Sequence, residues 1–307
     1  MSVNNKLVKP DCRFFNNIDI SGSILIKSSK DKYGAKIIEK EINFYRYILK
    51  NNINFSIPCI YSLDNNSIHM YYLKEYIPLY KYLDNTNDLN IISQVKDKLN
   101  ILHSSSQIKL DKEIFRKQLL SETTIKINKR INIIKHRLEQ YNYINFVNRI
   151  KIKTFNEYIE ILEIYINNWI EQQDQFIFNI IHGDPNLSNI LINPVSKDIV
   201  FIDPRGYFGE YLLYGPSIYD NIKILFGLSG YDNFNFSKTI DFIITDNNID
   251  IKINPITDTY FKQKQIETIL MVSIWLGLPQ YLENDTNKMI ISYFYSMYLA
   301  EKYFLYT

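Results

Sequence analysis

The sequence of 307 residues is short of several features that would assign it to a specialised class of protein. Its two cysteines, Cys12 and Cys59, are too few for a disulfide framework and favour a reducing compartment. Nine glycines and nine prolines are too few for a disordered or repetitive chain. No apolar run approaches the length of a membrane span, and the N-terminal residues have no signal-peptide core. These absences predict a cytoplasmic protein with no membrane partner.

An excess of charge of one sign is also lacking. Lysine and arginine total 35 against 33 aspartates and glutamates, which gives a net charge of +2. This balance gives no reason to expect nucleic acid as a partner. The segment 126–137 is locally basic. At helical spacing it is interpreted as a solvated face, with a grip on an anionic substrate or partner as the alternative.

The N-terminal part of the chain alternates between strand and helix patterns. The expected elements are a β-hairpin over 14–29, a helix over 34–50, and two strands over 57–62 and 68–76. A strand pair, a helix and a second strand pair within about seventy residues predict a small α+β lobe. We assign residues 1–77 to this lobe and expect it to bind a nucleotide.

The remainder, residues 78–307, has mainly helical patterns. The expected elements are a helix over 89–104, two helices over 111–176 with a break near 141–148, short strands between 178 and 203, and a helical C-terminal third. The predicted fold class is therefore α+β, with a small N-terminal lobe built on an antiparallel sheet and a larger, mainly helical C-terminal lobe that holds the catalytic and acceptor-binding residues.

A cluster of polar residues lies among the short strands. The sequence His182-Gly183-Asp184-Pro185-Asn186-Leu187-Ser188-Asn189 precedes one apolar strand, and Asp203 ends the next. Two strands of a hairpin can bring Asn189 and Asp203 to one Mg²⁺ ion, with Asp184 in the preceding loop facing a substrate hydroxyl. A carboxylate base and oxygen ligands for magnesium are what phosphoryl transfer from a nucleotide needs, so the cluster predicts a kinase. The alternative for Asp184 is a loop carboxylate that caps a helix.

This arrangement resembles the aminoglycoside phosphotransferase and choline kinase superfamily. The superfamily signature, His-Gly-Asp-x-x-x-x-Asn followed by a strand-end Asp, is matched in full, and the resemblance covers roughly residues 14–300. Leu-x-x-Leu-His at 99–103 and the hinge-like segment 72–77 extend it. The resemblance implies a two-lobed protein-kinase-like fold that uses ATP and Mg²⁺. Asp184 would be the catalytic base, Asn189 and Asp203 the magnesium ligands, and His182 a residue that orients the loop.

The resemblance also implies a nucleotide site in the N-terminal lobe. Its predicted residues are Lys27, Glu41, Ser21, Ser23 and Glu75. Lys27 matches the strand lysine that contacts phosphates, and Glu41 is its expected ion-pair partner, with Glu39 and Lys36 as rivals on the same helix. No Gly-rich phosphate loop is present, so the serine hydroxyls and backbone N–H groups of the hairpin turn are expected to replace it. Adenine would form hydrogen bonds with the backbone around residues Tyr72 to Glu75.

Asp203-Pro204-Arg205-Gly206 stands where protein kinases have Asp-Phe-Gly, and no Ala-Pro-Glu segment follows. Both departures disfavour a regulated protein kinase. Arg205 is expected either to brace a phosphate or substrate anion, or to pair with Asp220 or Glu210 as scaffold. Asp220 itself is expected to tie the start of a helix to the catalytic loop. This motif, with its later Tyr-Asp, resembles a subgroup associated with surface-glycan loci.

The predicted function is a small-molecule kinase that phosphorylates a hydroxyl of a sugar or sugar-like alcohol, for glycan precursor synthesis. A choline or amino-alcohol kinase is the alternative, and an aromatic cage for its cation could come from Tyr207, Phe208, Tyr211 and Trp275. An aminoglycoside would favour an acidic cleft, which the balanced charge does not indicate. Alternatives from other functional classes are a protein kinase and a non-catalytic nucleotide-binding module.

Overall fold

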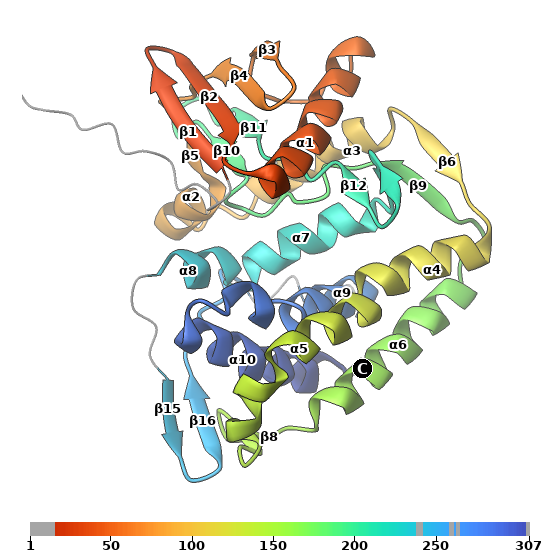
Figure 1. Cartoon of the computed structure of the whole chain (residues 1–307), viewed down its shortest axis with the longest axis vertical. Coiled ribbons are helices and arrows are strands. Elements are labelled where there is room, and N and C mark those ends of the chain that lie inside the picture. Colours follow the sequence, from red (N-terminus) through yellow and green to blue (C-terminus); the bar gives the residue numbers. More distant parts are fainter. Residues whose placement is uncertain (1–15, 238–241, 258–260, 262–264, 305–307) are drawn as a thin grey trace, which may run out of the picture.

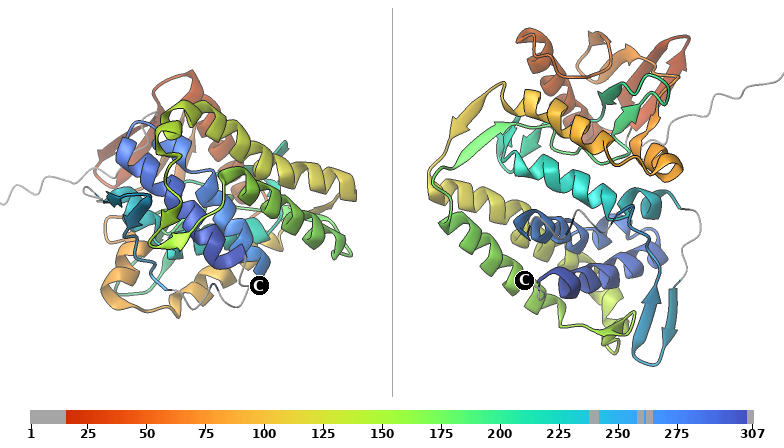
Figure 2. Two further views of the ribbon diagram at one scale, coloured as in Figure 1. Left: turned by 90° about the horizontal axis from the view of Figure 1, so that it is seen from below. Right: turned by 180° about the vertical axis from the view of Figure 1, so that it is seen from behind.

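The computed structural model describes residues 16–237, 242–257, 261 and 265–304. An antiparallel sheet and one long helix form the N-terminal part, and helices dominate the remainder (Figure 1). The view from behind in Figure 2 gives the same division, with the N-terminal sheet at one end of the molecule. The predicted α+β class is confirmed.

The N-terminal sheet has the strand order β1-β2-β4-β3, and all its pairs are antiparallel. Its elements are β1 (Asn16–Ser21), β2 (Ile24–Ser29), β3 (Ile60–Leu63) and β4 (Ser67–Tyr71), with helix α1 (Lys32–Lys50) packed beside them. Asp31 caps α1 by accepting a hydrogen bond from the backbone N–H of Gly34. The predicted hairpin and helix are confirmed, while residues 14 and 15 of the hairpin prediction lie outside the described residues.

Both strands expected after α1 are shorter than predicted. The first strand begins at Ile60, because the preceding segment runs beside β11 (Ile199–Phe201), where Ser56 accepts a hydrogen bond from the backbone N–H of Phe201 at 2.8 Å. The second strand ends at Tyr71, and residues 72–76 form a loop. This loop leads into β5 (Ile77–Pro78), which pairs with β10 (Ile190–Ile192). The division of the chain after residue 77 stays a prediction.

Two small sheets lie next to the polar cluster noted in the sequence, residues 182–189. One has the order β11-β10-β5 and the other β14-β9-β6. The elements not yet given are β6 (Gln107–Lys109), β9 (Ile177–Ile180), β12 (Tyr207–Phe208), β13 (Tyr211–Leu212) and β14 (Tyr214–Gly215). The short strands predicted between 178 and 203 are confirmed as β9, β10 and β11. The loop between β9 and β10 carries the His-Gly-Asp motif.

Helices make up most of the chain after residue 78. They are α2 (Leu79–Thr86), α3 (Ile91–His103), α4 (Lys112–Glu122), α5 (Thr124–Leu138), η1 (Glu139–Tyr141), α6 (Phe155–Glu171), α7 (Ile218–Leu228), α8 (Tyr231–Phe236), α9 (Gln265–Leu276), η3 (Pro279–Leu282) and α10 (Thr286–Phe304). The region 111–176 was predicted to hold two helices, but it holds three. Thr123 has φ −116° and ψ −104°, which breaks the first predicted helix into α4 and α5.

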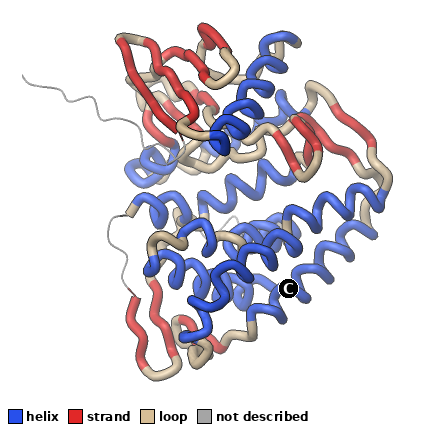
Figure 3. The backbone as a smooth tube through the Cα atoms, in the orientation of Figure 1, coloured by secondary structure: helices blue, strands red, loops and turns tan. Residues whose placement is uncertain are grey.

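The C-terminal third is mainly helical, as predicted, but it also contains strands that were not expected. Strands β15 (Phe242–Thr245) and β16 (Asn248–Ile251) form a hairpin, and β16 pairs in parallel with β7 (Phe146–Val147), which pairs with β8 (Ile150–Lys151). Figure 3 shows the sheet of β15, β16, β7 and β8 at the end of the molecule away from the N-terminal sheet. The expected break near 141–148 is therefore a strand pair that joins distant parts of the chain.

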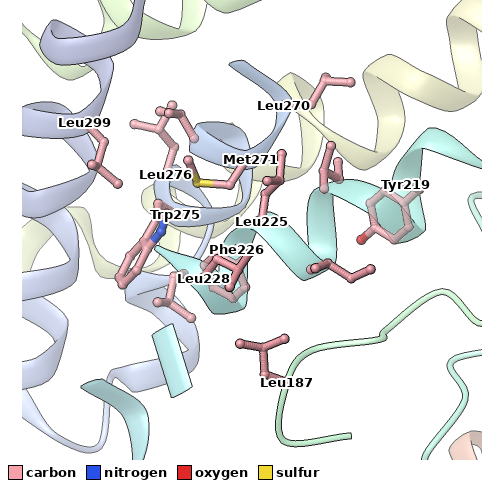
Figure 4. Packing of buried hydrophobic residues seen from close by; sticks show 14 of the residues in the cluster. Leu187, Tyr219, Leu225, Phe226, Leu228, Leu270, Met271, Trp275, Leu276 and Leu299 are labelled. Carbon is pink, nitrogen blue, oxygen red and sulfur yellow. The ribbon is translucent and has the colours of Figure 1, made fainter. Parts of the chain in front are cut away.

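The core of the helical part anchors the loop that carries the His-Gly-Asp motif. Trp275 of α9 is fully buried, donates a hydrogen bond from Nε1 to Ser229 Oγ at 2.7 Å, and packs edge-on against Phe226 of α7 (Figure 4). Leu187, from the loop after the His-Gly-Asp motif, is also fully buried. A Cβ at Gly227 would lie only 2.5 Å from Leu187 Cγ, so a residue without a side chain lets the loop pack directly on α7.

None of the helices in the described parts of the chain is both long enough and apolar enough to cross a membrane. Cys59 is an exposed free thiol. Cys12, the other cysteine considered for the redox compartment, lies outside the described residues.

Candidate active site

The loop between β9 and β10 holds Asp184 in a ring of polar contacts. Asp184 Oδ1 accepts a hydrogen bond from Asn186 Nδ2 at 3.0 Å and lies 2.9 Å from Lys223 Nζ. Asn189 Nδ2 donates to the backbone carbonyl of Asp184 at 2.9 Å, which closes the loop on itself. The structure thus brings together two of the predicted site residues, Asp184 and Asn189. Because the side chain of Asp184 is only 12% exposed, its carboxylate has a fixed direction.

His182 orients this loop, as expected. Its Nδ1 accepts a hydrogen bond from the backbone N–H of Asp184 at 3.3 Å, and its Nε2 lies 3.1 Å from the carbonyl oxygen of Ile202. Nε2 must therefore carry the ring hydrogen and donate it to that carbonyl. Burial lowers the pKa of His182 below its ordinary value, which favours the neutral ring. The imidazole links the loop to the residue before Asp203 and has both nitrogens engaged.

Asp220, at the start of α7, holds the loop from the other side. Its carboxylate is fully buried and accepts hydrogen bonds from the backbone N–H groups of His182 at 2.9 Å and Gly183 at 2.7 Å. His103 Nε2, at the end of α3, lies 2.9 Å from the same carboxylate. Asp220 therefore ties a helix start to the catalytic loop, as the sequence indicated. Gly183 has φ +81°, which only glycine adopts without strain.

The predicted nucleotide side gathers around Lys27. Lys27 Nζ lies 2.7 Å from Glu41 Oε2 and 2.6 Å from Asp203 Oδ1. Burial acts to lower the pKa of Lys27, but the two carboxylates outweigh burial and raise it above the ordinary value, so the ammonium stays charged. Glu39 and Lys36, the rivals to Glu41, are exposed. The structure thus joins residues of β2, α1 and the segment after β11 in one charged cluster.

The other three predicted nucleotide residues, Ser21, Ser23 and Glu75, are exposed. Gly22, between the serines, has φ +61°, and a Cβ there would meet nothing within 4 Å. The carbonyl oxygen of Ser23 accepts a hydrogen bond from the backbone N–H of Tyr72 at 2.7 Å, which connects the hairpin turn to the hinge-like loop 72–76. Among the described residues, no hydrogen bond joins these three side chains to the Lys27 cluster.

Asn189 and Asp203 fit the requirements of magnesium. Asn189 Nδ2 is committed to the carbonyl of Asp184, so the polar atom left on this amide is an oxygen. Asp203 supplies a carboxylate whose side chain is 32% exposed. Mg²⁺ prefers such oxygen donors and is usually held by one or two side chains together with substrate phosphates. Within the described residues there is no group of three or more His, Cys, Asp or Glu that could hold a metal ion.

Arg205 is held as scaffold, but neither of its expected partners is right. Its Nη2 donates to both carboxylate oxygens of Glu122, at 2.8 and 2.9 Å, and its Nη1 donates to the hydroxyl of Tyr219 at 2.9 Å. Asp220 instead accepts a hydrogen bond from the backbone N–H of His182, and Glu210 lies 3.3 Å from Lys117 Nζ on α4. Because Nη1 and Nη2 are both engaged within the chain, the guanidinium has little capacity for a substrate anion.

Glu122 makes the fold sensitive to acid. Burial acts to raise the pKa of Glu122, but Arg205 and Lys126 outweigh it and lower this pKa from 4.5 to about 2. The ionised carboxylate therefore stabilises the fold above pH 4.5, and this contribution is lost as the pH falls towards 2. We expect Glu122→Gln to lower the free energy of unfolding at pH 7 by about 3 kcal/mol. In urea titrations the difference from the wild type should shrink at pH 3; equal differences at both pH values would contradict this account.

The basic segment 126–137 lies on α5, where Lys129, Lys135 and His136 are exposed, as expected of a solvated face, while its arginines contact the chain itself. Arg130 donates to the carbonyl of Gly277 at 3.1 Å and to the hydroxyl of Tyr281 at 2.7 Å. Arg137 donates to the carbonyl of Glu283 at 2.5 Å. These arginines fasten α5 to η3 and the segment after it.

The aromatic residues proposed for a cation cage do not assemble. Trp275 and Phe208 are fully buried in the core, where Phe208 packs edge-on against Tyr219. Tyr207 lies between two cations of the chain itself, with Lys40 Nζ 3.6 Å and the Arg205 guanidinium 4.1 Å from its ring centre. The expectation of a cage from these side chains was wrong, because hydrophobic burial and internal cations occupy them.

The sequence interpretation missed Lys223, the ion-pair partner of Asp184. Lys223 follows Asp220 by three residues, and residues three apart share one face of a helix. Since Asp220 was expected to face the catalytic loop, that spacing was the available signal. Asn186, two residues after Asp184, was likewise not singled out.

The fold and the site together define a two-lobed protein-kinase-like architecture, with a lysine and glutamate in the sheet lobe and an aspartate loop in the helical lobe. Neither a model of a known protein family nor a curated protein matches the sequence. Among solved structures, the chain is similar to a choline/ethanolamine kinase family protein from Mesorhizobium loti, with a TM-score of 0.54 and 10% identity over 96% of this chain and 87% of that chain.

The chain is also similar to choline kinase LicA from Streptococcus pneumoniae, with a TM-score of 0.51 and 14% identity over 94% of this chain and 90% of that chain. The structure of LicA in complex with AMP aligns with a TM-score of 0.52 and 12% identity, over 96% of this chain and 90% of that chain. At such identities the likeness establishes the fold. The predicted protein-kinase-like fold is confirmed.

Proposed function

We propose that this protein is a small-molecule kinase that transfers the γ-phosphoryl group of ATP to a hydroxyl of a sugar or sugar-like alcohol. The observation that carries the proposal is the position of Lys27, buried between Glu41 and Asp203 at 2.7 and 2.6 Å. The three residues of this cluster come from separate parts of the chain, and burying such a cluster without a functional reason is costly. A non-catalytic module would have no need of it together with Asp184 and Asn189.

The chain's own residues would divide the work between the two predicted lobes, 1–77 and 78–307. Lys27 would bind and neutralise the phosphates, kept in place by Glu41, while the turn at Gly22 and the loop that includes Glu75 would contact the nucleotide. Asn189 and Asp203 would hold Mg²⁺, which when bound neutralises charge on the phosphate oxygens. Asp184 would orient the acceptor hydroxyl and take its proton.

The segment Asp203-Pro204-Arg205-Gly206 favours a small-molecule kinase over a regulated protein kinase. Arg205 is bound on both sides, to Glu122 and to Tyr219, and its backbone N–H donates to the carbonyl of His182 at 2.9 Å. A segment tied down at three points is poorly suited to act as a switch. The proposed role in glycan precursor synthesis in the cytoplasm rests on the resemblance of this motif alone.

The proposal is tested by acceptor-dependent release of ADP from ATP in the presence of magnesium. A panel of monosaccharides, sugar alcohols, amino sugars, choline, ethanolamine and aminoglycosides covers the acceptor classes, and Lys27→Met is the matched variant. We expect at least one neutral sugar or polyol to stimulate release, and Lys27→Met to lower kcat/KM by at least about 10²-fold. Failure of ATP to bind, measured by calorimetry, would overturn the proposal.

A further inference from the structure

The strongest unexplained feature of the site is the lysine that touches the proposed base. Lys223 Nζ lies 2.9 Å from Asp184 Oδ1, and its side chain is only 13% exposed. Lys223 sits one helical turn after Asp220, so α7 contacts the catalytic loop twice, once through a carboxylate and once through an ammonium. Neither the loop's hydrogen bonds nor the nucleotide cluster needs this cation.

Two aromatic rings of α7 flank the ammonium. Lys223 Nζ lies 5.8 Å from the ring centre of Tyr219 and 5.7 Å from that of Phe226. Burial acts to lower the pKa of Lys223, but Asp184 outweighs it and raises this pKa above the ordinary value, so the side chain is charged. The aromatic surface next to the base, which could attract a cation of the acceptor, is therefore occupied by a cation of the chain.

Carboxylates on the elements around Lys223 are engaged in other contacts. Glu122 is paired with Arg205 and Lys126, and Asp220 accepts hydrogen bonds from the loop. Burial raises the pKa of Asp232 on α8 to about 7, so this group is largely protonated in mildly acidic solution. The carboxylate that lies against Lys223 is Asp184, and the ammonium already neutralises it. An acceptor with an amine near its reacting hydroxyl would therefore compete with the fixed positive charge of Lys223 for this carboxylate.

We infer that Lys223 determines acceptor specificity: it excludes acceptors with a cationic group beside the reacting hydroxyl and admits neutral polyhydroxyl compounds, whose oxygens can accept a hydrogen bond from its ammonium. This inference rests on the proposed function, which it narrows from small-molecule acceptors in general to neutral sugars and polyols. It disfavours amino alcohols and aminoglycosides, because like charges in a partly buried site repel strongly.

In the reaction, Lys223 would keep the acceptor beside Asp184 while bonds exchange at phosphorus. The acceptor oxygen forms a bond to the γ-phosphorus, and the bond between that phosphorus and the bridging oxygen of ADP breaks, with its electron pair leaving on ADP. The hydroxyl proton passes to the carboxylate of Asp184. Lys223 donates a hydrogen bond and keeps its own protons throughout.

The test compares pairs of acceptors in which an ammonium group replaces one hydroxyl. ADP release is measured at about pH 6.5 with glucose and glucosamine, galactose and galactosamine, and ethylene glycol and ethanolamine. The ratio of kcat/KM, neutral over amine, is taken for each pair. We expect a ratio of at least about 10 in the wild type. Lys223→Met should lower the ratio to about 1, and Lys223→Arg, which keeps the charge, should preserve it.

The ratio separates specificity from a structural role, since a general loss of activity lowers both members of a pair equally. Lys117→Met, which removes an exposed lysine paired with Glu210, should leave the ratio unchanged. An amine preferred by the wild type, or a ratio unaltered in Lys223→Met, would overturn the inference alone. Absence of turnover with every acceptor would overturn the proposed function and this inference with it.

Discussion

Replacing Asp184 with asparagine is expected to lower kcat by about 10²–10⁴-fold, because a positioned base supplies an acceleration of that size. The substitution removes the proton acceptor but keeps the shape of the side chain. The shorter hydrogen bond from Asn189 Nδ2, at 2.9 Å, ends on the backbone carbonyl of residue 184 and is unaffected, and only a longer one, at 3.4 Å, ends on the side chain. The Lys27 cluster contains no atom of Asp184, so the affinity for ATP should stay within about threefold of the wild type.

The same chemical change at Asp198 is the matched control. Asp198 precedes β11, its side chain is 50% exposed, and it accepts a hydrogen bond from the hydroxyl of Tyr76. Asp198→Asn should change kcat by less than about twofold, as expected of exposed surface positions. Steady-state ADP release and calorimetric titration with ATP check both variants. If Asp184→Asn kept a tenth or more of the wild-type kcat, another group would have to accept the proton.

Local signals predicted the N-terminal part of the fold well. The hairpin β1–β2 follows from alternating residues around a glycine at φ +61°, and α1 follows from apolar residues at helical spacing after an aspartate that caps it. The same spacing distinguishes Glu41 from Glu39. Position 41 falls on the buried face of α1 and position 39 on the exposed face. The helical periodicity of the sequence therefore indicated that Glu41, and not Glu39, contacts Lys27.

Contacts between distant segments were harder to predict. Strands β7 and β16 lie about a hundred residues apart, and their two and four residues are too short to give a periodic pattern. Glu122 ends α4 without any sequence motif, yet it is the partner of Arg205. The pairing of Lys223 with Asp184 likewise arises only when α7 packs on the catalytic loop. A sequence motif can identify the residues of a site, but the residues that contact them are determined by the tertiary fold.

Replacing Asp220 with alanine is expected to have the largest effect on stability, about 3–5 kcal/mol. Its buried carboxylate accepts hydrogen bonds from the backbone N–H groups of His182 and Gly183 and contacts His103. Alanine would leave these groups buried without an acceptor. Because the two N–H groups belong to the loop that holds Asp184, kcat should also fall by at least about tenfold at temperatures where the variant is folded.

A comparison of Asp220→Ala with Asp220→Asn separates the loss of the acceptor from the loss of the charge. The amide keeps one oxygen for an N–H group of the loop, so the asparagine variant should lose roughly half as much unfolding free energy in urea titrations. Asp84→Ala, which removes an exposed carboxylate that binds Asn233, should cost less than about 0.5 kcal/mol. Equal stability of Asp220→Ala and the wild type would mean that the loop keeps its shape without the Asp220 carboxylate. The proposed role of α7 in positioning Asp184 would then be wrong.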